Sequence, residues 1–417
     1  MRGENDRTGK GIQAFTTDFL KKRNVMNVLN VLHNSRPISR ASIARSTGLT
    51  PTTVSSVVSR LLDLGIVQIV GPSTIRKGRR PILIDFNPEA FYVIGLDLGI
   101  HEVRVVVMDL HGSVTARIHE RIEEHRGKDY IISKLLQIIH KIIEELQIHV
   151  TEKLLGIGLS IPGLIDTEKG IPLFSANLPE LQNVEILRIF QKEFQIPVFV
   201  TNDVSAMALG ESKFGIARGY KNILCINVGH GIGSGIIING ELYRDMYSEG
   251  VFGHISILPF GHVCHCGSRG CLETMASGNA IASSAIRAVK SGGSATIKHL
   301  VDGKIDKISA ETVARASDMG DETAQRIVKE AATYLGIAIA NAIKLVSPHI
   351  IVIGGGVSKT GDMYFQTVKK TIEEYSFSIR DSFPEIALSS LGDDASCIGA
   401  ATLVLMKVFN KEGVPNY

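Results

Sequence analysis

The chain has 417 residues, which is long enough for two or three domains with a large core. Hydrophobic residues make up 44% and charged residues 21% of the sequence, and no run of eighteen apolar residues is free of charge, which argues against a membrane protein. The odd count of five cysteines and the lack of an apolar core near the N-terminus predict a protein of the reducing cytoplasm.

The charge is unevenly distributed along the chain. Residues 1–80 contain 14 basic and 4 acidic side chains, a balance of +10, whereas the remainder has 31 basic and 38 acidic side chains, a balance of −7. A basic first segment on an acidic body favours a domain that faces nucleic acid. A basic tail that only improves solubility would give the same balance, so charge alone does not decide the function.

The first eighty residues contain three stretches with helical patterns. Residues 25–34 have apolar side chains at helical spacing. A second helix is predicted to begin at a Ser39 cap and to stop at Gly48. A third is predicted to begin after Thr50, with Pro51 at its first position. Two short helices joined by a tight Gly-Leu turn predict a helix-turn-helix.

The outward face of the third helix is small and hydroxylated, which suits a major groove. The stretches IVQIV and PILIDF flank a basic loop and predict a β-hairpin wing for phosphate or minor-groove contact. A plain three-helix module that binds protein is the alternative, but the placement, the charge and the wing together favour double-stranded DNA. The predicted DNA-contacting residues are Thr52, Thr53, Ser55, Ser56, Arg60, Arg79 and Arg80.

From residue 93 onwards the pattern changes to apolar strands, glycine turns and helices. Examples are VIGLDLGIHEVRVVVMDL, ILCINVGHGIGSGIIING and HIIVIGGGVS. This repeated plan predicts α/β architecture. Two Gly-rich turns far apart in the sequence could cradle one nucleotide from two lobes, although such turns are common between strands.

The whole chain resembles the ROK family of repressors and sugar kinases. The most specific part is GHISILPFGHVCHCGSRGCLE, which is similar to the family's Gly-His followed by Cys-x-Cys-Gly-x-x-Gly-Cys-x-Glu. The resemblance implies an actin-like ATPase fold of two lobes, and the N-terminal winged helix resembles the repressor branch. We therefore expect a DNA-binding domain over 1–86, a first lobe over 87–205 completed by a helix over 396–410, and a second lobe over 206–395.

The segment HVCHCGSRGC, residues 262–271, contains three of the five cysteines. The resemblance implies a structural zinc held by His254, Cys264, Cys266 and Cys271. Three thiolates and one imidazole are a common closed zinc set that leaves no position for a catalytic water. A disulfide is disfavoured by the expected compartment. Reactive thiols, and ligation by His262 or His265, remain alternatives.

The resemblance also implies a set of residues that contact a sugar. These are Asn177, Asn202, Asp203, His254 and Glu273. Asp203 corresponds to the catalytic base of the kinases, while a helix N-terminal cap is the alternative role for the Asn-Asp pair. The family also has a sugar-binding Glu at the position of Val251, so this contact is lost here, unless Glu249 replaces it from a shifted loop.

Both phosphate loops depart from the kinase pattern. The first contains Ile100, His101 and Glu102 where the family has small, hydroxyl and Lys or Asn residues, and the second has His230 in place of a threonine. Bulk and negative charge near phosphates oppose ATP–Mg binding. We therefore expect no enzyme activity, with Asp203 a vestigial catalytic residue, and no ATP as cofactor.

Taken together, the sequence predicts a cytoplasmic transcriptional repressor of sugar-metabolism genes. It would bind a palindromic operator as a homodimer or a dimer of dimers and would be released by a sugar or sugar derivative between the lobes. One alternative is a sugar kinase with a DNA-binding head. A second alternative is a repressor that a protein partner controls. A third is a repressor that acts without a ligand or responds to an unusual effector.

Overall fold

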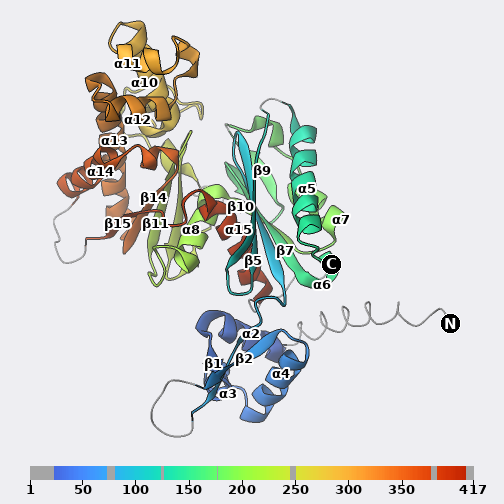
Figure 1. Ribbon diagram of the computed structural model, residues 1–417. Coiled ribbons are helices and arrows are strands. Elements are labelled where there is room, and N and C mark those ends of the chain that lie inside the picture. Colours follow the sequence, from blue (N-terminus) through green and yellow to red (C-terminus); the bar gives the residue numbers. More distant parts are fainter. Residues whose placement is uncertain are drawn as a thin grey trace.

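The computed structural model describes residues 23–72, 80–123, 126–175, 177–244, 250–376 and 383–409. They form a small N-terminal domain and a body of two lobes (Figure 1). The fold class predicted from the sequence is confirmed, with a winged helix-turn-helix before a two-lobed α/β body. Among the helices that these residues build, none combines the length and the apolar character that a membrane span requires.

The N-terminal domain has its three helices where the sequence predicts them. They are α2 (Arg23–Ser35), α3 (Arg40–Thr47) and α4 (Pro51–Asp63). The Ser39 side chain accepts the Ser42 N–H at the start of α3, and Gly48 ends that helix with φ +69°. Thr50 caps α4 in the same way, by accepting the Thr53 N–H. These local signals fix the turn between the two helices.

A three-stranded antiparallel sheet of order β1-β3-β2 completes this domain. The strands are β1 (Ile38–Ser39), β2 (Val67–Pro72) and β3 (Ile82–Phe86). β2 and β3 form the predicted hairpin, with Val67 opposite Phe86. The tip of the hairpin, with Arg76, Lys77 and Arg79, lies outside the described residues.

The first lobe contains a mixed sheet of order β10-β7-β4-β5-β6. Its strands are β4 (Tyr92–Leu98), β5 (Glu102–Asp109), β6 (Val114–Arg121), β7 (Leu154–Ile161) and β10 (Val198–Asn202). Beside it lie α5 (Lys128–Glu145), α6 (Val150–Lys153), α7 (Ile186–Phe194), the hairpin of β8 (Leu164–Asp166) and β9 (Ile171–Phe174), and the 3-10 turn η1 (Pro179–Leu181). Both faces of β4 are buried, which explains its continuous apolar run.

The second lobe contains a sheet of order β13-β12-β11-β14-β15. Its strands are β11 (Ile223–Val228), β12 (Ile232–Ile238), β13 (Glu241–Leu242), β14 (Ile350–Gly354) and β15 (Glu385–Leu388). Its helices are α9 (Glu273–Ala276), α10 (Gly278–Lys290), α11 (Ala295–Leu300), α12 (Ala310–Asp318), α13 (Glu322–Val346) and α14 (Asp362–Tyr375). The 3-10 turns are η2 (Val251–His254), η3 (Ile305–Lys307) and η4 (Gly356–Lys359).

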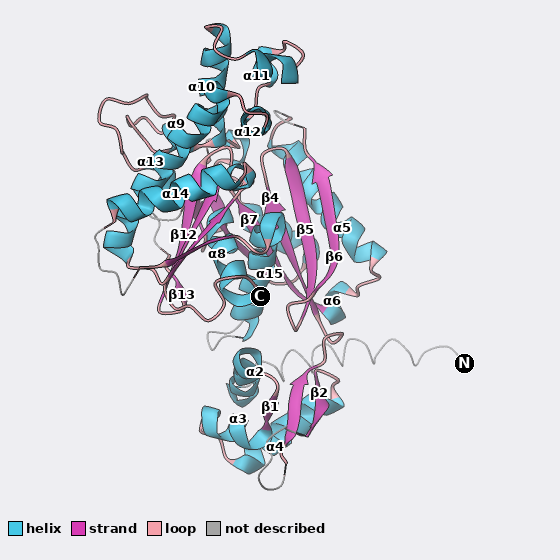
Figure 2. Ribbon diagram, turned by 60° about the vertical axis from the view of Figure 1, so that its left-hand side comes forward, coloured by secondary structure: helices cyan, strands magenta, loops and turns pink. Residues whose placement is uncertain are grey.

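Two helices, α8 (Asp203–Phe214) and α15 (Ala395–Phe409), lie between the two sheets (Figures 1 and 2). α15 packs on β4 and β7 of the first lobe, and α8 packs on α15 and on β11 and β12. The boundary expected between residues 205 and 206 falls inside α8, which touches both sheets. The division into domains stays a prediction.

Candidate functional site

The predicted DNA-facing surface is the outward side of α4. Thr52, Ser56 and Arg60 are exposed, while Thr53 and Ser55 are half-buried. The Thr53 hydroxyl lies 2.9 Å from the Thr50 hydroxyl in the helix cap, so part of its hydrogen-bonding capacity is used locally. The opposite side of α4 is fixed in the core of the domain by buried residues, namely Val54, Val57, Val58 and Leu61.

The wing contributes one described basic residue to this surface. Arg80, just before β3, is exposed. Arg79 lies outside the described residues. The structure is therefore compatible with contact between α4, Arg80 and DNA, and the individual roles stay predictions.

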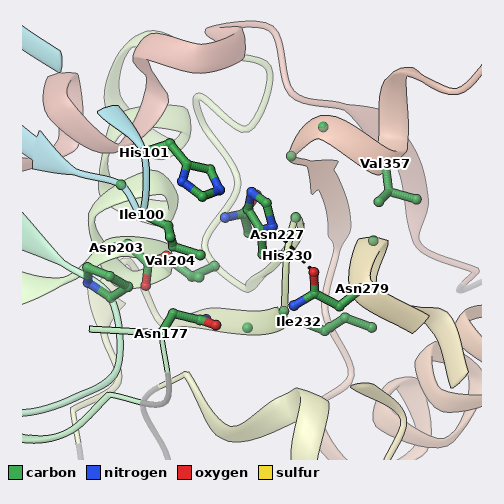
Figure 3. A pocket seen from close by; sticks show the side chains of 18 of the residues that line it. Ile100, His101, Asn177, Asp203, Val204, Asn227, His230, Ile232, Asn279 and Val357 are labelled. Carbon is green, nitrogen blue, oxygen red and sulfur yellow. Dashed lines mark hydrogen bonds between the residues drawn. The ribbon is translucent and has the colours of Figure 1, made fainter. Parts of the chain in front are cut away.

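A cavity of about 2000 Å³ lies between the two lobes. All five residues expected to contact a sugar line it, and Val251 lines it as well (Figure 3 shows part of the cavity). Asn177 follows β9, Asp203 opens α8, and His254 and Glu273 come from the second lobe. The structure thus brings together residues that are almost one hundred positions apart, while their contact with a ligand stays a prediction. Glu249, the alternative to the lost glutamate, lies outside the described residues.

Asn202 and Asp203 are expected either to cap a helix or to contact a ligand. The Asn202 side-chain oxygen accepts the N–H groups of Val204 (2.9 Å) and Ser205 (3.3 Å), and its amide donates to the Gly163 carbonyl (2.7 Å). Asn202 is 1% exposed, so it takes the alternative role of helix cap. Asn202 also lines the cavity, so its contact with a ligand stays a prediction beside its role as a cap.

Two carboxyl groups with raised pKa values lie at the base of the cavity. Burial raises the pKa of Asp203 to about 7, and the nearby charge of Asp97 contributes to this rise. Burial likewise raises the pKa of Asp97 to about 6, although the Ser160 hydroxyl donates to it over 2.6 Å and Arg104 lies 3.8 Å away. A carboxyl group with a pKa near 7 can donate or accept a hydrogen bond to a hydroxyl at neutral pH.

Glu273 is held in place from two sides. One carboxylate oxygen accepts the N–H of Ile232 over 2.8 Å, and the other lies 3.3 Å from Nε2 of His265. A side chain at Gly231 would collide with this carboxylate, because its Cβ would lie 2.3 Å from Oε2. The glycine in the second loop therefore leaves room for Glu273.

The predicted metal ligands form one cluster at the edge of the cavity. The ligand atoms of His254, Cys264, Cys266 and Cys271 all lie within 4.8 Å of one another. Nδ1 of His254 is 3.6 Å from Sγ of Cys264, and the sulfurs of Cys266 and Cys271 are 3.7 Å apart. The edges of a tetrahedron with zinc–sulfur bonds of about 2.3 Å measure about 3.8 Å. The donor set therefore fits a tetrahedral cation.

The surroundings of the cluster agree with ligation. All five cysteines are free thiols, so the disulfide alternative finds no support. Burial lowers the pKa of His254, which favours the neutral imidazole that a cation requires. Gly270 turns the chain with φ +67°. A Cβ there would lie 1.7 Å from the Leu258 carbonyl oxygen, so only glycine fits.

A second group of donors partly overlaps the first. His254, Cys264, His265 and Glu273 also lie within 4.8 Å of one another. His265 is exposed, whereas Cys264 and Cys271 are buried, and a closed structural site favours the buried thiols. His262 belongs to neither group and is exposed.

The two loops that depart from the kinase pattern meet across the cavity. The rings of His101 and His230 have their centroids 4.9 Å apart at 76°, an edge-to-face contact (Figure 3). Nδ1 of His230 also lies 3.4 Å from Oδ1 of Asn279. Both histidines depart from the kinase pattern in the sequence, but no sequence pattern indicates their contact. Asn279 and Ser160 are likewise marked by no motif.

Comparison with known proteins places both parts of the chain. The model of the ROK family matches residues 93–407, and a model described as winged helix-turn-helix DNA-binding matches residues 22–68. The xylose repressor of Caldicellulosiruptor bescii is 30% identical over 387 residues, which cover 93% of this chain and 96% of that protein.

Solved structures match the whole chain or its body. The crystal structure of a ROK family transcriptional regulator, a homologue of the E. coli MLC protein, has a TM-score of 0.77 and 28% identity and covers 93% of this chain and 97% of that one. A ROK family glucokinase from Streptomyces griseus, in complex with glucose and AMPPNP, has a TM-score of 0.67 and 27% identity, and covers 75% of this chain and 98% of that one.

Proposed function

Because the chain belongs to the ROK family, we propose that it is a DNA-binding transcriptional repressor of sugar-metabolism genes, released from its operator by a sugar or sugar derivative. One observation carries the proposal. The winged helix shares a continuous hydrophobic core with a body whose cavity is lined by the polar residues expected to bind a sugar. The xylose repressor similar to this chain is covered over nearly its full length, which supports the same assignment.

Operator binding would rest on α4 and the wing. The exposed hydroxyls of Thr52 and Ser56 suit hydrogen bonds to base edges, and Arg60 and Arg80 suit phosphate contacts. One such module makes few contacts, so we expect two copies on a palindromic site, in a homodimer or a dimer of dimers. This activity implies a cytoplasmic protein.

The effector site would lie on the floor of the cavity. Asp203, Asn177 and Glu273 offer carboxylate and amide groups that pair with neighbouring hydroxyls of a sugar. Val251 presents an apolar wall among them, which favours an effector without a hydroxyl at that point. Closure of the lobes on the sugar would shift the protein towards a form with lower operator affinity.

The thiol and imidazole cluster would hold a structural zinc ion. When bound, zinc supplies four strong bonds that fix the segment 254–271 but leaves no open position for chemistry. His254 would then orient one wall of the cavity, because it belongs to both the cluster and the lining. Metal content and effector affinity should therefore change together.

A sugar kinase with a DNA-binding head is the second candidate. Two observations favour a kinase. Asp203, at the position expected for the catalytic base, is half-buried in the cavity, and the body is similar to a glucokinase. The contact between His101 and His230 opposes it, because it joins the two loops that would have to receive phosphates. A third candidate is a repressor that a protein partner controls. Such a protein would leave its operator when the partner binds, and no sugar would release it.

Fluorescence anisotropy with DNA from upstream of the protein's own gene tests the proposal. Release by a sugar in the absence of ATP would support a repressor, whereas ATP-dependent formation of a sugar phosphate would support the kinase.

A further inference from the structure

We infer that helix α15 transmits the state of the cavity between the lobes to the winged helix. The inference rests on the proposed function, because it concerns how a ligand in the cavity changes operator affinity. Five observations carry it: the first turn of α15, the contacts of the turn that precedes it, its packing along the body, its last turn and the second attachment of the winged helix.

The first turn of α15 lies at the cavity. Ala395 and Ser396 line it, and the Ser396 hydroxyl donates to the backbone carbonyl of Asp203 over 2.9 Å. A ligand that draws Asp203 towards itself therefore pulls directly on the start of α15.

Both lobes contact the short turn η6 (Gly392–Asp394) that precedes α15. Asp393 pairs with Lys359 of the second lobe (2.5 Å), and Asp394 pairs with Arg117 of the first (2.8 Å). Exposed ion pairs such as these add little stability. They attach two neighbouring carboxylates to different lobes, Asp393 to the second and Asp394 to the first. A movement of one lobe relative to the other therefore changes the forces on this end of α15.

The body of α15 is packed too closely to absorb such a change. A Cβ at Gly399 would lie 1.6 Å from the carbonyl oxygen of Ala206 in α8. A Cβ at Gly95 or Gly158 would lie about as close to the carbonyls of Cys397 and Ala400, at 1.9 and 2.0 Å. At these points backbone contacts backbone, so no side chain between them can rearrange. We therefore treat α15, which is about 22 Å long, as a rigid element that moves with its neighbours.

The last turn of α15 reaches into the core of the winged helix. The Phe409 ring lies 5.3 Å from the ring of Phe86 in β3 and 5.7 Å from the ring of His33 in α2, measured between centroids. Phe409 is 5% exposed, and Val408 beside it is also buried in the same cluster. A shift of this turn therefore displaces α2 and the wing strand together.

A second attachment of the winged helix to the body runs through the first lobe. Arg36 donates to the carbonyls of Leu110 and His111, over 2.5 and 2.8 Å, in the turn between β5 and β6. His111 in turn contacts the Phe86 carbonyl over 3.1 Å. β5 leads from the cavity, which Glu102 and Arg104 line, to this turn, but it belongs to the first lobe alone. α15 instead contacts the first-lobe sheet, α8 and the winged helix.

A lock across the cavity tests the inference without knowledge of the effector. In His101→Cys/His230→Cys the two new thiols face each other across the lobes, and dibromobimane, which fluoresces when both its arms have reacted, would join them. Because the native thiols of Cys266 and Cys271 are also 3.7 Å apart, the parent protein treated in the same way gives the baseline, and peptide mapping identifies the cross-linked pair. Two readouts follow: hydrogen exchange of the α2 amides, which requires no DNA, and affinity for the operator fragment. We expect the lock to change both, with an operator affinity at least about fivefold lower.

Two substitutions in α15 test whether the signal passes through this helix or through another part of the body. In the locked protein, Ser396→Ala or Phe409→Leu should reduce the operator shift to less than about twofold, while the bimane fluorescence stays. Ser212→Ala removes a hydroxyl bond of the same 2.9 Å length within α8, and Phe190→Leu truncates a buried ring in the first lobe. Both controls should keep the full shift.

The two possible failures are distinguishable. An absent operator complex with a lock-dependent change in α2 exchange would reject the proposed repressor but keep the transmission. Unchanged α2 exchange on locking, or an equal shift in the Ser396→Ala and Phe409→Leu proteins, would overturn the role of α15.

Discussion

His101 and His230 face each other across the two lobes, with ring centroids 4.9 Å apart. They come from the β4–β5 and β11–β12 loops, which the resemblance to the family's kinases implies to be the phosphate loops. The contact joins the loops at the place where a kinase would separate them around a triphosphate.

This contact predicts that Mg-ATP does not bind. A ligand at one hundred times its Kd stabilises a protein by about 2.7 kcal/mol, so binding would raise the Tm visibly. We expect the thermal unfolding curve to be unchanged by Mg-ATP and no sugar phosphate to form. A sugar kinase of the same fold serves as the positive control. A saturable rise in Tm that disappears in a His230→Ala protein would contradict the prediction.

Replacement of a cluster thiol should remove the metal and weaken the fold. For Cys264→Ser or Cys271→Ser we expect less than one zinc per chain and a loss of stability on the order of several kcal/mol, because structural zinc contributes directly to folding. Atomic absorption and urea unfolding measure the two effects.

Two histidines supply the controls for the metal prediction. His262→Ala changes an exposed residue outside both donor groups and should keep the zinc. His265→Ala tests the overlapping group and should keep it as well. Loss of zinc in His265→Ala, with retention in Cys271→Ser, would replace the proposed ligand set by the second one.

Asp203→Asn should remove a pH dependence of stability. The pKa of Asp203 is raised from 3.8 to about 7 in the folded protein. Between these values the folded state binds the proton that the unfolded state has lost, so stability falls as the pH rises from about 4 to about 7. The difference corresponds to at most about 4 kcal/mol at 1.36 kcal/mol for each pKa unit.

Urea unfolding at pH 5 and pH 8 measures this effect. We expect the Asp203→Asn protein to be more stable than the parent by about 4 kcal/mol at pH 8 and by only about 1.6 kcal/mol at pH 5, with operator binding intact and the effector response impaired. Asp166→Asn is the matched control, because hydrogen bonds from Lys169 lower the pKa of that carboxyl. An Asp203→Asn protein that is destabilised at pH 8 would contradict the assigned environment.

Arg80→Ala should weaken operator binding in a salt-dependent way. If Arg80 contacts a phosphate, its loss lowers the slope of log K against log salt by about 1 and affects all DNA sequences equally. Arg315→Ala removes an exposed charge on α12, far along the second lobe, and should leave the slope unchanged. Equal slopes for Arg80→Ala and the parent would remove the described part of the wing from the contact surface.

The sequence predicts the winged helix in detail because its signals are local. Ser39, Gly48 and Thr50 act within three or four residues of their own positions, and the structure has each of them at the expected helix end. The alternation of IVQIV and PILIDF likewise reports a hairpin whose partners are close in the chain.

Relationships between distant residues could not be predicted in the same way. Nothing in the local pattern links Ser160 to Asp97, or Phe409 to Phe86 and His33. The bonds of the Asn202 side chain to Gly163 and to the α8 backbone likewise depend on the geometry of the strand end, and its contact with a ligand stays a prediction. Such contacts depend on how the sheets and α15 pack, which a one-dimensional pattern does not contain.

The most direct test of the central claim is operator anisotropy titrated with a panel of sugars without ATP. We expect tight binding of DNA from upstream of the protein's own gene and release by one sugar or sugar derivative, with the release lost in Asp203→Asn. Tight binding that no sugar disturbs, or release that requires ATP and yields a sugar phosphate, would contradict it.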